Sequence, residues 1–225
     1  MSDSRSVSTM LNTTAREQMI EQQVRAWDVL DARVLELLRK VPREHFVPEA
    51  QRAFAFADIE VRLPHGQHML RPNVVGRLLQ ALELTGRERV LEVGAGSGFV
   101  TACLAGTAAQ VQSLEVIPEL ASLARENLAS LGIRNAQVTA GDGLQPDTRT
   151  RYGAIAVTGS MPVYESALQA QLEIGGRLFV VVGEGPAMDA RLVRRTSEDA
   201  WTTTSLFETV IDPLINAPRP PGFSF

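Results

Sequence analysis

The chain has 225 residues and a formal net charge of -4, and 44% of its residues are hydrophobic while 21% are charged. This length suits one well-packed domain with an appendage, and the composition is that of a globular protein rather than a disordered or fibrous one. Because 22 basic residues face 26 acidic ones, nothing in the charge balance favours nucleic acid or an anionic membrane surface as a partner. Small molecules or proteins are the expected partners.

The cysteine count bears on compartment and metal binding. The single cysteine, Cys103, excludes an intramolecular disulfide and a multi-cysteine metal site, and it is compatible with a reducing cytosol. Residues 1–13 lack the apolar segment of an export signal, and no stretch approaches the roughly 20 apolar residues that span a bilayer. We therefore expect a cytoplasmic protein that binds no metal and no membrane. The oligomeric state is left open, a homodimer included.

The first 72 residues predict two amphipathic helices followed by an irregular loop. Thr14-Ala15-Arg16-Glu17 matches a capping box, and apolar residues follow it at helical spacing as far as Trp27. Asp31 is the expected cap of a second helix that runs toward Val41. Two prolines then interrupt the pattern, and residues 54–72 mix Gly, Pro and His in a way typical of a loop.

From residue 73 onward, apolar strands alternate with helices. Expected strands cover 89–93, 111–116, 136–140, 154–158 and 177–182, with helices from 72 or 73, over 99–105 and over 118–131. This rhythm predicts an α/β fold, a doubly wound and mostly parallel sheet. Segments 191–196 and 202–211 predict an antiparallel hairpin at one edge. We therefore divide the chain into N-terminal helices and a loop (1–72), an α/β domain (73–211) and a proline-rich tail (212–225). The tail is expected to dock on its own domain, the alternative being that Phe223 and Phe225 enter a neighbouring subunit.

The sharpest motif is a glycine-rich turn, Gly94-Ala95-Gly96-Ser97-Gly98, between an expected strand and an expected helix. Glycine lets the backbone bend sharply and lets a ligand approach closely. Phe99 stands where a dinucleotide fingerprint needs Gly or Ala, and no Lys-Ser/Thr pair follows as in a P-loop. With Glu92 two residues before the turn, the pattern favours a positively charged sulfonium nucleotide, S-adenosylmethionine. The alternative is a tight turn without a ligand.

Two further acids follow the next strands. Glu115 lies at the carboxyl end of the second strand, where its carboxylate can accept hydrogen bonds from both hydroxyls of a ribose. Glu92 and Glu115 are then expected to face one crevice. Asp142, between Gly141 and Gly143, follows the third strand and can accept from an adenine amino group. The alternatives are a solvated surface acid at Glu115 and a plain turn at 141–143.

Taken together, these motifs resemble those of class I methyltransferases and, more closely, of the protein-L-isoaspartate O-methyltransferase family, over nearly the whole chain. The matching segments are Val41-Pro42-Arg43-Glu44-His45-Phe46-Val47-Pro48, Gly66-Gln67 with Pro72, Glu92–Gly98, Gly141-Asp142-Gly143, Val157-Thr158 and Gly175-Gly176-Arg177-Leu178. The resemblance implies that S-adenosylmethionine lies against Glu92, Gly94, Ala95, Gly96, Gly98, Glu115, Val116, Asp142 and Gly143, with Thr158 near the reacting end.

This chain departs from the family at the substrate loop. Family members usually carry Thr-Ile-Ser there, and the serine contacts the methyl-accepting carboxylate; here the matching residues are His68, Met69 and Leu70. Leucine cannot donate that hydrogen bond. His68 or Ser160 is a candidate for a replacement contact, the alternative for His68 being an ordinary packed loop histidine. No residue is assigned a catalytic role, because a carboxylate is already ionised at neutral pH.

The leading hypothesis is an S-adenosylmethionine-dependent O-methyltransferase that acts in protein repair, on a carboxylate of a peptide, protein or small molecule. A second hypothesis keeps the enzyme class and changes the acceptor. A third is a non-catalytic module that binds the cofactor and a partner protein.

Overall fold

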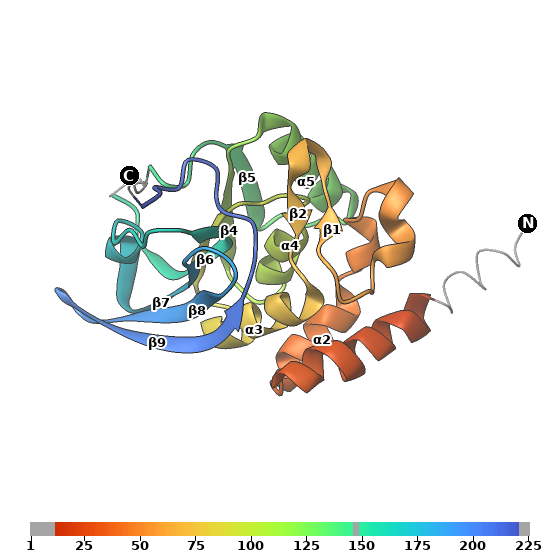
Figure 1. Ribbon diagram of the computed structural model, residues 1–225, viewed down its shortest axis with the longest axis horizontal. Coiled ribbons are helices and arrows are strands. Elements are labelled where there is room, and N and C mark those ends of the chain that lie inside the picture. Colours follow the sequence, from red (N-terminus) through yellow and green to blue (C-terminus); the bar gives the residue numbers. More distant parts are fainter. Residues whose placement is uncertain (1–11, 146–148, 221–225) are drawn as a thin grey trace, which may run out of the picture.

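The N-terminal region of the computed structural model, which describes residues 12–145 and 149–220, is helical (Figure 1). A helix runs over residues 12–19, continues as a π-helical turn, Ile20–Val24, and ends as a 3₁₀ turn, Arg25–Trp27. The chain then reverses at Asp28, whose φ is 58°. Helix α2, Ala32–Lys40, starts at Asp31, whose side chain accepts a hydrogen bond from the Arg33 amide at 2.9 Å. The second predicted cap is therefore confirmed.

The capping box predicted at Thr14 is wrong. Residues 12 and 13 are already helical, so Thr14 does not precede the first helical residue, as a capping residue must. The local pattern of Thr14 and Glu17 is compatible with a cap, but Glu17 instead pairs with Arg39 of α2, with both of its oxygens 3.1 Å from Nε. The Glu17 side chain thus forms a contact between two helices, which the local sequence cannot show.

The segment between α2 and the sheet is more regular than predicted. Residues 54–72 were expected to form an irregular loop, but β1 and β2 pair there as a small antiparallel sheet. The apolar positions of β1 and β2 are buried in the main core, which is what holds these short strands in place. The elements of this segment are the 3₁₀ turns Arg43–His45, Glu49–Phe54 and Pro64–Gly66 and the strands β1, Val61–Arg62, and β2, His68–Met69.

The main sheet has seven strands in the order β5-β4-β3-β6-β7-β8-β9. The first five are parallel, and β8 and β9 continue the sheet as an antiparallel hairpin at one edge, which confirms the predicted fold class. The strands are β3, Arg89–Val93; β4, Gln110–Glu115; β5, Ala136–Ala140; β6, Tyr152–Met161; β7, Leu172–Val182; β8, Met188–Ser197; and β9, Ala200–Thr209. The helices between them are α3, Pro72–Leu82; α4, Phe99–Ala105; α5, Pro118–Ser130; and a 3₁₀ turn, Gln169–Gln171.

Two hydrophobic clusters cover the two faces of the sheet. Successive strand residues point to opposite faces, so Val90 packs into the cluster beneath helices α3, α4 and α5, whereas Leu91 and Val93 pack into the cluster on the other face. The N-terminal helices join the first cluster through Ile20 and Val24. Residues before and after residue 72 belong to one hydrophobic cluster. The division of the chain into three parts therefore stays a prediction.

The strand order places a crevice at the end of β3. From β3 the chain builds outward through β4 and β5 and then returns to the other side of β3 to form β6. Parallel α/β sheets bind ligands outside the carboxyl ends of the strands at such a switch point. The last described segment also reaches this edge: Asp212 carbonyl oxygen accepts from the Ser160 amide at 2.8 Å, and the Leu214 amide donates to Ser160 carbonyl oxygen at 2.9 Å. Docking of the tail is thus confirmed for residues 212–216, and 221–225 lie outside the described residues.

No helix within the described ranges combines the length and the apolar character needed to cross a bilayer.

The cap of α2 gives a test of the fold. Asp31→Ala removes the hydrogen bond to the Arg33 amide and is expected to lower the free energy of unfolding by about 1 kcal/mol, measured by urea denaturation. Asp31→Asn keeps an acceptor at this position and should lie much nearer to the wild type. Equal losses in the two variants would show that the charge of Asp31, rather than the cap, matters.

Candidate functional site

The glycine turn after β3 is tightly enclosed by protein atoms. Gly94, Gly96 and Gly98 have φ values of 97°, 54° and 87°. A Cβ added to Gly94 would lie 2.5 Å from Thr158 Oγ1, and one on Gly98 would lie 3.2 Å from the Ala124 backbone. Both backbone conformation and the nearby protein atoms therefore require glycine at Gly94 and Gly98, while the close approach of a ligand stays a prediction.

Glu115 connects this turn to the end of β4. Its Oε2 accepts from the Gly96 amide at 2.8 Å, its Oε1 accepts from the Ile117 amide at 3.0 Å, and the residue is only 5% exposed. Each carboxylate oxygen can accept more than one hydrogen bond. Glu115 lies on the wall of the cavity at this edge of the sheet, so its remaining lone pairs are available to a ligand.

Glu92 lies beneath the turn. We expected it to face the crevice beside Glu115, but it shares the helix-covered face with Val90 and is not on the cavity wall. Its Oε2 accepts from Thr101 of α4 and from Ser113 of β4, while its Oε1 has no partner among the described residues. Burial raises the pKa of Glu92 to about 7, although the two hydroxyl hydrogen bonds oppose the shift.

The cavity extends along the carboxyl ends of β3, β4, β5 and β6. Its empty space, counted out to the solvent at the mouth, is about 710 Å³. A second hollow of about 320 Å³ adjoins it on the other side of the turn and includes Ala95 in its wall. The predicted site residues on the larger cavity are His68, Met69, Leu70, Gly94, Gly96, Glu115, Val116, Asp142, Gly143 and Thr158.

The residues after β5 form one end of this cavity. Asp142 Oδ1 accepts from the Leu144 amide at 2.9 Å, an Asx-turn that fixes the loop. Gly143 approaches β3 so closely that a Cβ there would lie 2.5 Å from Val93 Cγ1. Asp142 and Val116 line this end. A polar and an apolar side chain together suit a nucleoside base, which has a polar edge and apolar faces.

The predicted substrate loop forms the other end. Met69 and Leu70 are 5% and 7% exposed, and His68 is more open. Buried Arg43 fixes this loop, since its Nη2 donates to the Leu70 carbonyl oxygen and its Nε donates to the Ala55 carbonyl oxygen, both at 2.9 Å. Burial lowers the pKa of Arg43 to about 10, so it remains charged near neutral pH.

Besides Glu92 and Ala95, two further predicted residues are absent from the larger cavity, each for a structural reason. Gly98 packs against Ala124 of α5. Ser160, proposed as a replacement contact, is fully buried, and its hydroxyl donates to the Ile211 carbonyl oxygen at 3.3 Å. Ser160 therefore holds the tail and does not reach a ligand in the cavity.

Sequence reasoning missed several residues on the wall. Glu60 comes from the segment read as a loop, and Asp212 and Leu214 come from the tail. An acid directly after a strand end, as in Ile211-Asp212-Pro213, was the available signal for Asp212. No sequence signal brings the tail to the end of β6.

The wall has the chemistry of a site for a cationic nucleoside. Four acids line it, namely Glu60, Glu115, Asp142 and Asp212, and the glycine turn leaves its backbone open at one side. The Glu115 carboxylate, at the carboxyl end of β4, can accept hydrogen bonds from both hydroxyls of a ribose. The four acids on the wall favour a positively charged sulfonium. These residues fit S-adenosylmethionine.

The strand order of the main sheet, the glycine turn after β3 and Glu115 at the end of β4 together place the chain among the class I methyltransferases. A family model described as protein-L-isoaspartate(D-aspartate) O-methyltransferase matches residues 14–217. Protein-L-isoaspartate O-methyltransferase 1 of Rhodopseudomonas palustris (strain HaA2) is 43% identical over 203 residues, which are 89% of this chain and 82% of the relative. The corresponding enzyme of Methanoculleus marisnigri is 41% identical over 182 residues, 80% of this chain and 83% of its own.

A solved structure has the same fold. It is described as a protein-L-isoaspartate O-methyltransferase from Plasmodium falciparum in complex with S-adenosyl-L-homocysteine, and it superposes with a TM-score of 0.75 over 91% of this chain and 98% of its own, at 20% identity. The chain belongs to the protein-L-isoaspartate(D-aspartate) O-methyltransferase family.

The shifted acid beneath the turn predicts a pH dependence. Because the pKa of Glu92 rises from 4.5 to about 7 on folding, its contribution to stability is complete below about pH 4.5 and is lost as the pH rises through about 7. Glu92→Gln removes this loss, so the variant should gain stability relative to the wild type by roughly 3 kcal/mol between pH 4.5 and pH 8. Urea denaturation at several pH values measures it. Exposed Glu36→Gln is the control, and parallel curves for Glu92→Gln and wild type would contradict the prediction.

Proposed function

We propose that this chain transfers the methyl group of S-adenosylmethionine to the carboxylate of an isoaspartyl residue in a peptide or protein. The observation that carries the proposal is a single cavity with two chemically different ends. Asp142 and Val116, which follow β5 and β4, lie at one end and the loop His68–Leu70 at the other. The glycine turn, which lines a hollow together with that loop, lies between the two ends. Membership of the family supports this substrate class.

The proposed cofactor contacts use groups already on the wall. Glu115 accepts from the ribose hydroxyls through the lone pairs that the Gly96 and Ile117 amides leave free. Asp142 accepts from the adenine amino group, and Val116 packs against the base. Thr158 fixes the reacting end, because its hydroxyl donates to the Val93 carbonyl oxygen at 2.9 Å.

When bound, S-adenosylmethionine supplies a methyl carbon made electrophilic by the adjacent sulfonium. The chain itself has three tasks: to bind the acceptor, to orient it and to exclude water. It needs no strong general base, because a carboxylate with a pKa near 4 is ionised at neutral pH. Orientation in a shaped pocket accounts for most of the expected acceleration.

The tail contributes to the exclusion of water. Leu214 and Ile215 lie on the cavity wall, and Leu214 packs 3.6 Å from the position of a Cβ on Gly94. Apolar side chains across the site strengthen the electrostatic contacts inside it by displacing solvent.

A second candidate function is methylation of a different acceptor, and Leu70 is the observation that favours it. Leu70 lines the cavity where the family usually has a serine, and it offers no hydrogen bond. A small carboxylic acid or another nucleophile would tolerate this change.

Three further assignments are also proposals. They are a cytoplasmic location, the division of the chain at residues 72 and 211, and small-molecule or protein partners rather than nucleic acid. The family relationship supports a peptide or protein as the partner.

Transfer of labelled methyl groups tests the function. The protein is incubated with labelled S-adenosylmethionine and either an isoaspartyl peptide or the same sequence with a normal aspartyl residue. Label in the isoaspartyl peptide alone is expected. Label in neither peptide, together with transfer to a small acid in a parallel screen, would favour the second candidate.

Glu115 gives the sharpest test of the cofactor site. Glu115→Ala is expected to weaken binding of S-adenosylhomocysteine by about 1–3 kcal/mol, roughly five- to 150-fold in Kd, because the ribose loses its acceptor. Calorimetry measures it. Glu119→Ala, at an exposed acid on α5, is the control and should bind as the wild type does. A loss of only a few tenths of a kcal/mol at Glu115 would mean that this acid serves only the backbone amides.

A further inference from the structure

A histidine and an aspartate from distant parts of the chain meet at the acceptor end of the cavity. His68 Nδ1 of β2 lies 2.6 Å from Asp212 Oδ2 of the tail, 144 residues later in the sequence. An ionised carboxylate only accepts hydrogen bonds, so Nδ1 carries the proton and donates. The tail is independently fixed by its backbone bonds to Ser160, so Asp212 sets the orientation of the imidazole ring.

The other ring nitrogen of His68 is free for a ligand. Nε2 has no hydrogen-bond partner in the part of the chain that the structure describes, and the side chain is 31% exposed. His68 lines both the larger cavity and the adjoining hollow, beside Leu70. A packed loop histidine with both nitrogens satisfied, the alternative considered from the sequence, does not describe this arrangement.

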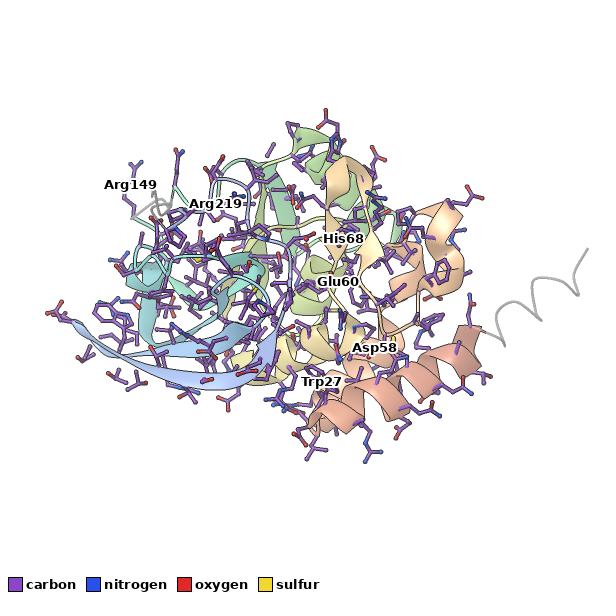
Figure 2. All side chains as sticks on the ribbon, viewed as in Figure 1. Trp27, Asp58, Glu60, His68, Arg149 and Arg219 are labelled. Atoms are coloured by element: carbon purple, nitrogen blue, oxygen red, sulfur yellow. The ribbon has the colours of Figure 1, made fainter. Side chains whose placement is uncertain are left out.

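Glu60 lies at the same place and has an unsatisfied atom. Figure 2 shows Glu60 and His68 close together at the small β1–β2 sheet, and both line the cavity. Glu60 Oε1 is buried without a partner among the described residues. Burial raises the pKa of Glu60, while Arg71 and His68 oppose the shift and Asp212 adds to it. Buried polar atoms normally find a hydrogen-bond partner, so this oxygen is suited to a group that enters with the ligand.

We propose that His68 Nε2 binds the methyl-accepting carboxylate, that Asp212 positions the ring, and that Glu60 binds a peptide group next to that carboxylate. The proposal rests on the proposed function and names the residues that recognise its acceptor. An acceptor with one carboxylate and an adjacent peptide group satisfies both Nε2 and Glu60 Oε1. A free small acid satisfies only the first.

The charged groups at this end are the acids Glu60 and Asp212 and the bases His68 and Arg71. The imidazolium form of His68 carries a donor on each ring nitrogen, so Nε2 can donate to a carboxylate while Nδ1 donates to Asp212. During transfer, an oxygen lone pair of the acceptor forms the bond to the methyl carbon, and the electron pair of the broken carbon–sulfur bond stays on sulfur. No proton moves, so His68 acts by binding and orienting the acceptor.

His68→Asn separates this role from a structural one. The asparagine amide can still donate to Asp212 from the position of Nδ1, but nothing replaces Nε2. We expect the KM for an isoaspartyl peptide to rise at least tenfold, with a smaller change in kcat and a Kd for S-adenosylhomocysteine within about twofold of the wild type. The same substitution at exposed His65, which is not on the cavity wall, is the control and should leave all three unchanged.

The positioning residue and the second contact have their own variants. Asp212→Ala should raise the KM for the isoaspartyl peptide. Asp212→Asn keeps an acceptor for Nδ1–H, so it should raise this KM less than Asp212→Ala does. Glu60→Ala should raise the KM for the peptide but not for a small carboxylic acid.

The outcomes distinguish this proposal from the function on which it rests. If the wild type methylates the isoaspartyl peptide and His68→Asn keeps the wild-type KM, the assignment of His68 fails and the proposed function stands. If the wild type methylates no isoaspartyl peptide, both fail.

Discussion

The turn between β3 and α4 is held from two sides by carboxylates, and the rest of the site depends on that arrangement. From below, Glu92 ties together β4 and α4 through Ser113 and Thr101. From above, Glu115 accepts from the Gly96 amide and so joins the turn to the end of β4. The backbone of the turn then cannot move without breaking charge-assisted hydrogen bonds in a buried region, where they are strong. A rigid turn is what allows a cavity to keep its shape at a sheet edge.

The parallel sheet was predictable from sequence because its physical cause is local. Continuous apolar runs such as Ile155–Val157, alternating with helical segments, are typical of strands covered on both faces. The glycines at 94, 96 and 98 mark a turn whose backbone conformation requires them. The edge hairpin was equally predictable, because alternating polar and β-forming residues and a short connection produce it. Helix ends were less predictable. Asp31 caps α2 as predicted. Thr14 does not cap the first helix, and Glu17, its expected partner in the capping box, pairs with Arg39 of another helix.

The site was predictable where it follows the strands and was missed where distant segments join it. Glu115 and Asp142 lie on the wall because strand ends in a parallel sheet converge there. Glu92 was placed wrongly because strand alternation turns it toward the helices, a point that its nearness to the glycines obscures. Asp212 follows an expected strand, but the 144 residues between His68 and Asp212 leave no periodic pattern that would bring the two together. Glu60 was missed because its segment was read as an irregular loop. Ser160 was overvalued because its hydroxyl donates to Ile211, 51 residues later, and the tail covers it.

The wall formed by Ile211–Ile215 has a consequence for biogenesis. These residues follow every strand of the sheet, so the central sheet can assemble as the chain leaves the ribosome while the cavity still lacks one side. We therefore expect ligand affinity to appear only after this last wall has docked on the sheet.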